Sequence, residues 1–300
     1  MKIIIVGGGT SGWMTAAYFS KHFNWLDISL IESDTIPRIG VGESVSPHIA
    51  FFFDSLGIPR HEWMRETNAT YKLTNRFYNW MGEGEHQHFS FSFPTNKEVL
   101  LRDCDKPTSI SDNLKPSQPI TDALIKMISE GKVDRFDQWH YSQYHYSEHS
   151  KAPFDGEDFL LNIPFTHAQH IDAERTADYL RDKVANGVNH IIGDVTNIKA
   201  SDGFIDWVEV NGNRLQADLF IDCTGMSQLL VKEMNWGKKY YENNLIDSAW
   251  VCPIEYEDKK EQFKPYTQSI AQDNGWMFKI CLQNRMGSGI CYSSNHSSDE

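Results

Sequence analysis

The feature that most constrains this 300-residue chain is a glycine pattern close to its first residue. Gly7, Gly9 and Gly12 directly follow KIIIV at 2–6, a short apolar run rich in β-branched residues. A stretch typical of a helix comes next, and a second apolar run, ISLIE, occupies 28–32. Strand, glycine turn, helix and strand in this order predict a βαβ unit.

The spacing G-x-G-x-x-G is typical of dinucleotide binding when a strand and a helix flank it. The first glycine permits the tight turn, the second lets the backbone approach a pyrophosphate, and the third permits close contact between helix and strand. The N-terminus of the helix offers N–H groups and a positive dipole to the phosphates. Glu32 lies 20 residues past Gly12, where a carboxylate can accept the ribose hydroxyls. We therefore expect a bound dinucleotide rather than a chance glycine-rich turn.

This pattern does not distinguish NAD from FAD. A later apolar strand, LFIDC at 219–223, ends in Thr224-Gly225 and is similar to the strand that closes the nucleotide-binding domain of two-dinucleotide-type flavoproteins. It favours FAD, although any buried parallel strand followed by a turn would look the same. The fold class expected is α/β, with a doubly wound, Rossmann-like FAD/NAD(P)-binding domain and an interleaved substrate domain. The expected divisions are an FAD-binding part at 1–80, a substrate-domain insertion at 81–165, a second FAD-binding part at 166–230, and substrate domain again at 231–300.

Other segments give local predictions. A Ser-Pro start, an apolar stripe at helical spacing and a closing glycine predict a helix over 46–57. Residues 69–80, ATYKLTNRFYNW, alternate as one strand would. Helices are expected near 121–131 and from Asp172, and a strand is expected at 190–195.

Composition narrows the partners. The chain has 28 Lys and Arg against 41 Asp and Glu, a net charge of −13, which repels nucleic-acid phosphates and anionic lipid. No apolar run reaches membrane-span length, and the first run is too short for a signal peptide. We expect a cytoplasmic protein that binds neither nucleic acid nor membrane; its oligomeric state is not predicted. Without a C-x-x-C pair, the five cysteines are expected to be reduced thiols that pack as small hydrophobes: Cys104, Cys223, Cys252, Cys281 and Cys291.

Several segments together resemble the flavin-dependent tryptophan halogenases. They are GGGTSGW at 7–13, PRIGVGES at 37–44, ATYKLTNRFYNW at 69–80, ADLFIDCTG at 217–225 and NGWMFKICLQNRMGSGICYSS at 274–294. The resemblance implies an FAD-dependent oxidoreductase in which reduced FAD, oxygen and a halide (chloride, bromide or iodide) yield hypohalous acid. The acid would halogenate a small, electron-rich aromatic substrate of indole or phenol type. No second, NAD-type glycine pattern is present, so a separate flavin reductase is the expected source of reduced FAD.

The resemblance assigns the catalytic role to Lys72, which would hold hypohalous acid by a hydrogen bond or form a haloamine. Arg76 cannot take the haloamine route, because a guanidinium stays protonated and its charge is delocalised. Tyr71 and Leu73 flank the lysine and are expected to desolvate it, which would lower its pKa. The alternative is an ordinary exposed strand lysine.

The resemblance also places the flavin. The loop at 38–44 would contact the isoalloxazine side, the alternative being a plain surface turn, and Val195 would contact the adenine end through its backbone. The residues expected to contact FAD are Gly7, Gly9, Thr10, Ser11, Gly12, Trp13, Glu32, Arg38, Ile39, Val41, Glu43, Ser44, Val195, Thr224 and Gly225.

The sequence departs from the family pattern in two places. In the W-x-W-x-I-P segment, which is thought to separate substrate from flavin, Phe278 replaces the second Trp and Cys281 replaces the Pro. The change bears on substrate handling rather than flavin binding. Family members also continue past the position of Glu300 through a region with a catalytic glutamate, the halide-binding backbone and a second flavin contact, so we expect this sequence to be a fragment.

Two other functions stay open at this point. One is an FAD-dependent aromatic monooxygenase, and the other is a non-catalytic flavin-binding module. An aromatic group at 139–146 would either line a pocket for a flat substrate or pack at a surface. No metal site is expected, because the spacings of seven histidines match no recognised ligand set and bring no carboxylate alongside: His86, His88, His140, His145, His149, His167 and His170.

Overall fold

The structure is a computed structural model. It describes residues 1–91, 118–152, 154–155, 158–159, 167–234, 236, 241 and 243–298, so Cys104 lies outside the described residues. The chain forms two compact units, each made of three stretches. The first unit consists of Met1–Gly40, Phe53–Thr67 and Asp172–Asn244, and the second of Val41–Phe52, Asn68–Ile171 and Leu245–Glu300.

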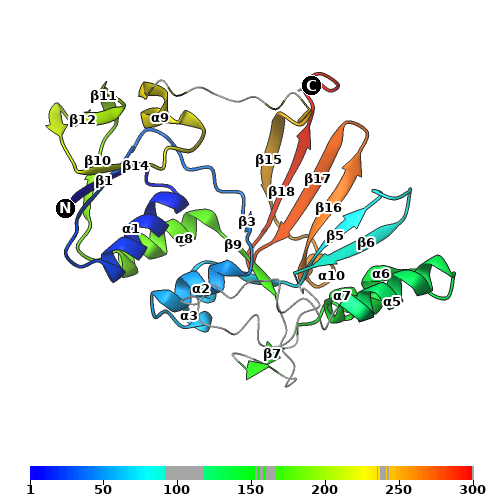
Figure 1. The fold of residues 1–300 in the computed structure, drawn as a ribbon. Coiled ribbons are helices and arrows are strands. Elements are labelled where there is room, and N and C mark those ends of the chain that lie inside the picture. The colour runs from blue at the N-terminus through cyan, green and yellow to red at the C-terminus, as the bar shows by residue number, and fades with distance from the viewer. Residues whose placement is uncertain are drawn as a thin grey trace. The chain divides into compact units, whose positions relative to one another are not determined.

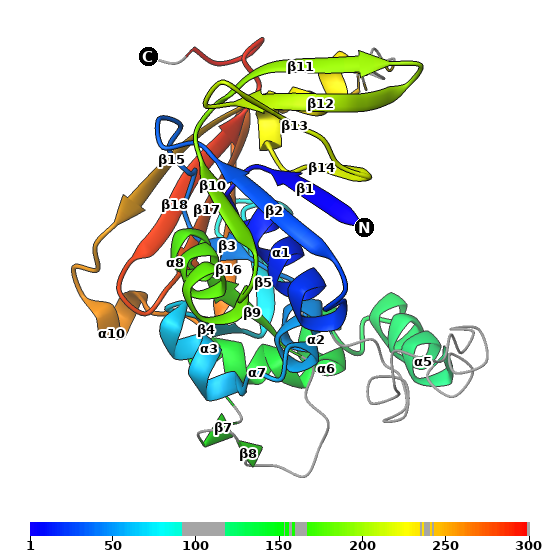
Figure 2. The ribbon, with the colours of Figure 1, turned by 90° about the vertical axis from the view of Figure 1, so that its left-hand side faces the viewer.

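A four-stranded parallel sheet organises the first unit (Figure 2). Its strands, in the order in which they pair, are β10 (Asn189–Ile192), β2 (Asp27–Glu32), β1 (Lys2–Val6) and β14 (Leu219–Asp222). Every strand is short and rich in branched aliphatic residues, as strands of a buried parallel sheet are. This sheet confirms the predicted α/β, Rossmann-like fold class.

Alternate side chains of a strand point to opposite faces of the sheet, so the apolar residues of β1 must be covered on both faces. On one face, Ile4 and Val6 share a core with Val208 of the antiparallel sheet formed by β11 (Val195–Ser201), β12 (Phe204–Val210) and β13 (Asn213–Leu215). Helix α1 (Thr10–His22) contacts both β1 and β2 and packs against α8 (Ala173–Tyr179).

Three further features complete the first unit. Helix α8 begins at the predicted place, where the carboxylate of Asp172 accepts a hydrogen bond from Arg175 N, and it continues into a π-helical turn (Leu180–Val184). Helix α3 (Arg60–Glu66) carries Trp63, whose ring stacks on Phe53 at a centroid distance of 4.4 Å. A 3₁₀ turn (Gly225–Ser227) and α9 (Leu229–Glu233) follow β14.

A six-stranded sheet organises the second unit (Figure 1). In pairing order it contains β15 (Ser248–Ile254), β18 (Met286–Tyr292), β17 (Gly275–Cys281), β16 (Tyr266–Gln272), β5 (Thr74–Tyr78) and β6 (His86–Ser90). Among the described strands of this sheet, the β16–β5 pair is parallel and the others are antiparallel. A small sheet joins β3 (Glu43–Ser44), β9 (Ala168–Ile171) and β4 (Thr70–Lys72).

Five helices and one pair of short strands complete the secondary structure of the described residues. They are α2 (His48–Ser55), which lies within the predicted 46–57, α5 (Gln118–Ser129), α6 (Phe136–His140), α7 (Ser142–Glu148), α10 (Lys259–Gln262), and the paired β7 (Phe154–Asp155) and β8 (Asp158–Phe159). Among the described residues, none of the helices has the length and apolar character needed to cross a bilayer.

The prediction of one strand over 69–80 is wrong. The stretch forms β4 and β5, which belong to different sheets and are separated by Leu73. Leu73 donates its backbone N–H to Pro265 O at 2.7 Å, and its side chain is fully buried. Because of this break, Lys72 lies in the small sheet and Arg76 in the large one.

Candidate functional site

The glycine pattern forms a turn between β1 and α1 in the first unit. Gly7 has a φ of +114°, and a side chain there would collide with Cys223 O. A side chain at Gly12 would overlap the carbonyl oxygen of Gly7. Gly9 occupies the N-cap of α1, with no side-chain cap and with no atom within 4 Å of the place where a Cβ would lie. The turn therefore presents N–H groups at a helix N-terminus beside open space, an arrangement that fits a pyrophosphate.

The other predicted nucleotide contacts follow the carboxyl ends of parallel strands, where ligands of such sheets bind. Gly7 follows β1, Glu32 ends β2, and Thr224 follows β14. Thr224 is fixed by Asp222, whose Oδ1 accepts from the Thr224 N–H at 3.0 Å and from its hydroxyl at 2.6 Å. Asp222 Oδ2 also accepts from Leu230 N at 2.9 Å, so this carboxylate holds the turn and the start of α9 together.

The carboxylate of Glu32 already has a full set of partners in the protein. Its Oε1 accepts from Nε of Arg38 at 3.0 Å and also from Nη2, while Oε2 accepts from Trp13 Nε1 at 3.3 Å and lies 2.8 Å from His190 Nε2. Arg38 Nη1 donates in addition to Asp178 at 2.8 Å. Two carboxylate oxygens offer about four acceptor sites. A ribose hydroxyl must therefore replace one of these donors or share its place.

The remaining contacts predicted in the first unit lie around the same turn or at a strand start. Thr10 Oγ1 donates to Ala173 O at 3.0 Å, and Ser11 O accepts from Thr15 Oγ1 at 2.8 Å. Gly225 begins the 3₁₀ turn, and Val195 begins β11, where it pairs with Val210. Ile39 is 73% exposed.

In the second unit, Val41, Glu43 and Ser44 line a cavity of about 580 Å³. Val41 O accepts from Arg285 Nη1 at 2.7 Å, and β3 pairs with β9, so both ends of this loop are held. The departure from the family segment reaches the same cavity, because Phe278 lies in its wall. The lining residues are Val41, Gly42, Glu43, Ser44, Asn75, Phe77, Trp80, Thr267, Ser269, Trp276, Phe278 and Ile280. A flat, largely apolar ligand fits walls of this kind.

Lys72 is not an exposed strand lysine. Only 4% of the residue is accessible, and burial lowers the pKa of its ammonium to about 8. Its Nζ lies 3.4 Å from Val45 O and 4.6 Å from the centroid of the Phe91 ring. A lysine with a displaced pKa and few polar partners is a candidate for acid–base or nucleophilic chemistry.

A buried chain of hydrogen bonds joins the lysine strand to the loop at 41–45. His170 Nδ1 lies 3.1 Å from Thr70 Oγ1, and its Nε2 lies 2.9 Å from Thr267 Oγ1. Thr267 Oγ1 is in turn 2.6 Å from Ser44 Oγ. His170 is completely buried, and its desolvation, with a smaller contribution from the charge of Lys72, lowers its pKa to about 3. It is therefore a neutral link between β4, β16 and β3.

Sequence reasoning grouped His170 with the other histidines and missed this role. The available signal was its place in an apolar strand directly before the helix start at Asp172, but the two threonine partners come from distant parts of the chain.

The aromatic group at 139–146 does not form one pocket wall. Trp139 is 62% exposed, whereas Tyr141 lines a different cavity of about 1180 Å³.

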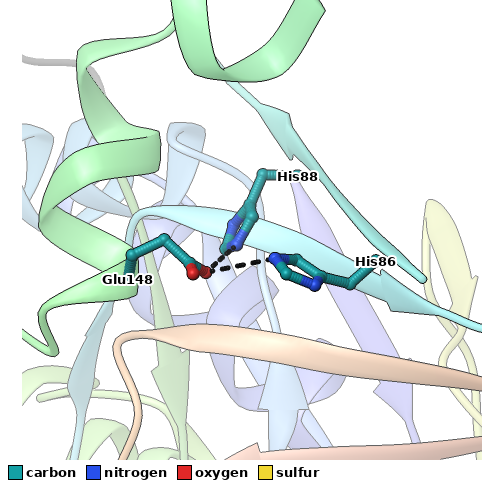
Figure 3. Close-up of side chains that lie close together, drawn as sticks. All are labelled: His86, His88 and Glu148. Atoms are coloured by element: carbon teal, nitrogen blue, oxygen red, sulfur yellow. Dashed lines mark hydrogen bonds and ion pairs between the residues drawn. The ribbon is translucent and has the colours of Figure 1, made fainter. Parts of the chain in front are cut away.

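Two histidines that spacing alone set aside meet a carboxylate in the structure. His86 and His88 project from β6 toward Glu148 at the end of α7 (Figure 3). His88 Nε2 lies 2.9 Å from Glu148 Oε1, and His86 Nε2 lies 3.6 Å from it. This cluster could not be predicted from the spacing of the histidines, because Glu148 comes from a helix far along the chain.

Comparisons with known proteins agree with these observations. The family model for tryptophan halogenase matches residues 2–300. The chain is 34% identical to the tryptophan 6-halogenase ThaL of Streptomyces albogriseolus, over 99% of the chain and 56% of that protein. It is 33% identical to the tryptophan 7-halogenase RebH of Lentzea aerocolonigenes, over the whole chain and 57% of that protein. The crystal structure of the tryptophan 6-halogenase SttH from Streptomyces toxytricini superposes with a TM-score of 0.84 at 30% identity, over 99% of this chain and 58% of that one.

The chain thus spans a little over half the length of the curated relatives that it matches. The family match covers nearly all of its residues, and it includes both the glycine turn of the first unit and the lysine strand of the second. The chain belongs to the tryptophan halogenase family.

Proposed function

We propose that this chain provides the FAD site and the catalytic lysine of an FAD-dependent halogenase that acts on an indole-like aromatic substrate. The observation that carries the proposal is the setting of Lys72, a buried primary amine with a pKa lowered to about 8 and its Nζ 3.4 Å from the backbone of Val45. Relatives named tryptophan 6- and 7-halogenases support the indole-like substrate.

The resemblance assigns a flavin-binding role to residues of each unit, taken separately. The turn at Gly7, Gly9 and Gly12 would receive the pyrophosphate, and Glu32 the ribose, by exchange of one of its present donors. Val41 to Ser44 would contact the isoalloxazine ring. Reduced FAD, once bound there, would supply the two electrons that activate oxygen. One oxygen atom would then oxidise the halide to hypohalous acid, and the other would leave as water. A separate flavin reductase would keep it reduced.

Lys72 would act on hypohalous acid in either of its protonation states. As an ammonium, it donates a hydrogen bond to the oxygen of the acid and orients the halogen toward the substrate. As an amine, it attacks the halogen: an N–X bond forms, the O–X bond breaks, and the oxygen leaves as water after taking the amine proton. With a pKa of about 8, roughly one tenth of the lysine is neutral at pH 7. An unperturbed lysine would be neutral several hundred times less often.

The hydrogen-bond chain through His170 supports a positioning role beside this chemistry. It connects Thr70, two residues before the lysine, to Ser44 in the loop proposed to contact the flavin. Because each member is buried or half-buried, movement of the loop would disturb the hydrogen bonds behind Lys72. His170 would thereby keep the two groups in register without touching the reacting atoms.

The test is product analysis by mass spectrometry. The protein is supplied with FAD, a flavin reductase, NADH, oxygen and either chloride or bromide, together with tryptophan, simpler indoles and phenols. Halogenated product is expected from the wild type. Lys72→Ala should abolish it and leave FAD binding, measured by fluorescence quenching, unchanged. Lys72→Arg keeps a charged donor but no primary amine, so it separates the two routes: it should be inactive if the haloamine carries the halogen and partly active if a hydrogen bond is enough. Lys260→Ala, at an exposed lysine, should be active.

The other outcomes point elsewhere. Oxygenated product from both the wild type and Lys72→Ala would identify an aromatic monooxygenase. Halogenated product from Lys72→Ala would remove the lysine from the mechanism. Bound FAD without any product would favour a flavin-binding module, or would show that activity needs the region by which the relatives are longer.

A further inference from the structure

We propose that His86, His88 and Glu148 form a binding site for a divalent transition-metal ion of the kind that prefers imidazole ligands, with Zn²⁺ as the representative. The proposal concerns a cluster outside the cavity that contains Val41 and Glu43, and it does not depend on the halogenase proposal. All three residues belong to the second unit.

The backbone brings suitable ligands to one side of a strand. Residues two apart on a strand point to the same face, so His86 and His88 project together from β6. Glu148, the last residue of α7, reaches the same point, and one ligand atom from each residue lies within 4.8 Å of the others (Figure 3). Bonds from Zn²⁺ to nitrogen and oxygen are about 2.0–2.2 Å, which places ligands of one ion roughly 3–4 Å apart. Small side-chain rotations bring this cluster into that range.

The nitrogen of His86 lacks a partner that a metal would provide. His86 Nε2 is buried, yet it makes no hydrogen bond to any described residue, and Glu148 Oε1 is 3.6 Å away. Buried polar atoms are normally satisfied, so an unpaired nitrogen aimed at a carboxylate is unusual. An ion between the two would bind both.

His88 has the support that metal-binding histidines usually have behind the ring. Its Nδ1 lies 2.7 Å from Thr74 Oγ1, and a hydroxyl can accept from an Nδ1–H as well as donate to a bare Nδ1. When Nδ1–H donates to Thr74, Nε2 carries no proton, and its lone pair faces Glu148. The backbone N–H of His88 donates to Asp137 Oδ2 at 2.7 Å, which fixes the strand at the same position. Such outer partners orient a ligand and raise its affinity for metal.

Arg76 competes for the carboxylate and sets the expected strength of the site. Its Nη1 lies 3.0 Å from Glu148 Oε1 and 2.9 Å from the hydroxyl of Tyr266. The guanidinium and both histidines approach the same oxygen, Oε1. Glu148 must therefore turn its carboxylate to keep the guanidinium on one oxygen and bind an ion with the other. The positive charge nevertheless opposes a divalent cation. We therefore expect Arg76→Met to tighten metal binding, whereas a cluster that is only an Arg–Glu–His hydrogen-bond network would gain no metal affinity.

The site opens toward solvent on one side. His86 and His88 both line the cavity of about 1180 Å³ that also contains Tyr141. His88 is buried, while His86 and Glu148 are partly exposed. Three protein ligands and an open approach leave a fourth position for water or a small ligand, as in zinc sites that bind exogenous molecules.

The test uses the whole chain after treatment with a chelator and its removal. Zn²⁺ binding is measured by calorimetry, and Co²⁺ binding by its visible absorption, which reports coordination geometry. We expect one equivalent of each ion. His86→Ala, at a partly exposed position, should weaken Zn²⁺ binding by more than tenfold without unfolding, and Thr74→Val by about 10- to 100-fold. His149→Ala, at an exposed histidine next to Glu148, is the matched control and should bind like the wild type.

Three results would overturn the proposal. The first is that the wild type binds neither Zn²⁺ nor Co²⁺. The second is that His86→Ala binds as tightly as the wild type, which would place the ion on other histidines. The third is that Arg76→Met binds Zn²⁺ more weakly than the wild type. Circular dichroism of each variant separates loss of the site from loss of the fold.

Discussion

Replacing Lys72 by methionine should make the protein more stable at pH 7 while removing its proposed activity. Methionine has a similar length and volume but no charge, so it fits the space between Phe91 and the backbone of Val45. The variant therefore removes the cost of burying an ammonium group and leaves the surrounding packing in place. A functional residue held at a cost to stability is common at active sites.

The magnitude follows from the pKa. Burial lowers the pKa of Lys72 from 10.5 to about 8, and each unit corresponds to about 1.4 kcal/mol, so the charged form costs about 3 kcal/mol below pH 8. The variant loses the cation–π contact with Phe91 and the long hydrogen bond to Val45, which together destabilise it by about 1 kcal/mol. We expect Lys72→Met to raise the free energy of unfolding by about 2 kcal/mol at pH 7.

The pH dependence has a definite sign. Between pH 8 and 10.5 the unfolded chain holds a proton on Lys72 that the folded protein has lost, so the stability of the wild type rises with pH in this window. The advantage of Lys72→Met should accordingly shrink by up to about 3 kcal/mol between pH 8 and 10.5. Below pH 8 it should be constant.

Urea unfolding at pH 7, 8, 9 and 10, followed by fluorescence, measures this difference. The difference in free energy of unfolding between variant and wild type at each pH is free of the titration of all other groups, because these titrate alike in both proteins. Lys260→Met, at an exposed lysine, serves as the control and should show a difference close to zero throughout. A Lys72→Met protein that is less stable than the wild type at pH 7, or a difference that does not vary with pH, would refute the reasoning.

The glycine turn and the buried histidine give two further predictions. Gly9→Ala should change the free energy of unfolding by less than about 1 kcal/mol, because open space surrounds the new methyl group, yet it should weaken FAD binding by tenfold or more. Gly12→Ala, whose methyl group would overlap Gly7 O, should lower both the free energy of unfolding and the affinity for FAD. Equal effects of the two variants on the free energy of unfolding would contradict this explanation. His170 has a folded pKa of about 3, below its ordinary 6.5, so the unfolded chain takes up the proton first and wild-type stability falls as the pH drops through this window. His170→Gln, which cannot titrate, should flatten that fall by about 2 kcal/mol between pH 6.5 and 5 in acid unfolding followed by circular dichroism, and an unchanged slope would exclude His170 as its source.

The parallel sheet of the first unit could be predicted because its signals are local. An apolar run, three glycines and a helical stretch lie in direct succession, and Glu32 and Thr224 mark the ends of two more strands. Parallel pairing then brings all of these to one edge of the sheet without further information. The same locality explains why α2 and α8 were found close to their predicted positions.

Features that depend on distant partners could not be predicted. Alternation alone made residues 69–80 one strand, whereas the chain bends where Leu73 donates to Pro265 O, which comes from a loop much further along. For Glu32, its position was predictable but the four donors that fill its oxygens were not. His170 shows the same limit, since nothing near it in sequence identifies Thr267 as its partner.

The pairing of β1 between β2 and β14 has a consequence for how the protein is made. The first strand leaves the ribosome early, but Leu219, which pairs with Ile3, is added only after roughly 200 further residues, which takes roughly 10–40 seconds at ordinary rates of synthesis. During that time one edge of β1 is unpaired, and Ile4 and Val6, which later pack against β12, are uncovered. The nascent chain is therefore a candidate for protection by a chaperone until β14 arrives, and slow translation after β2 would lengthen its exposure.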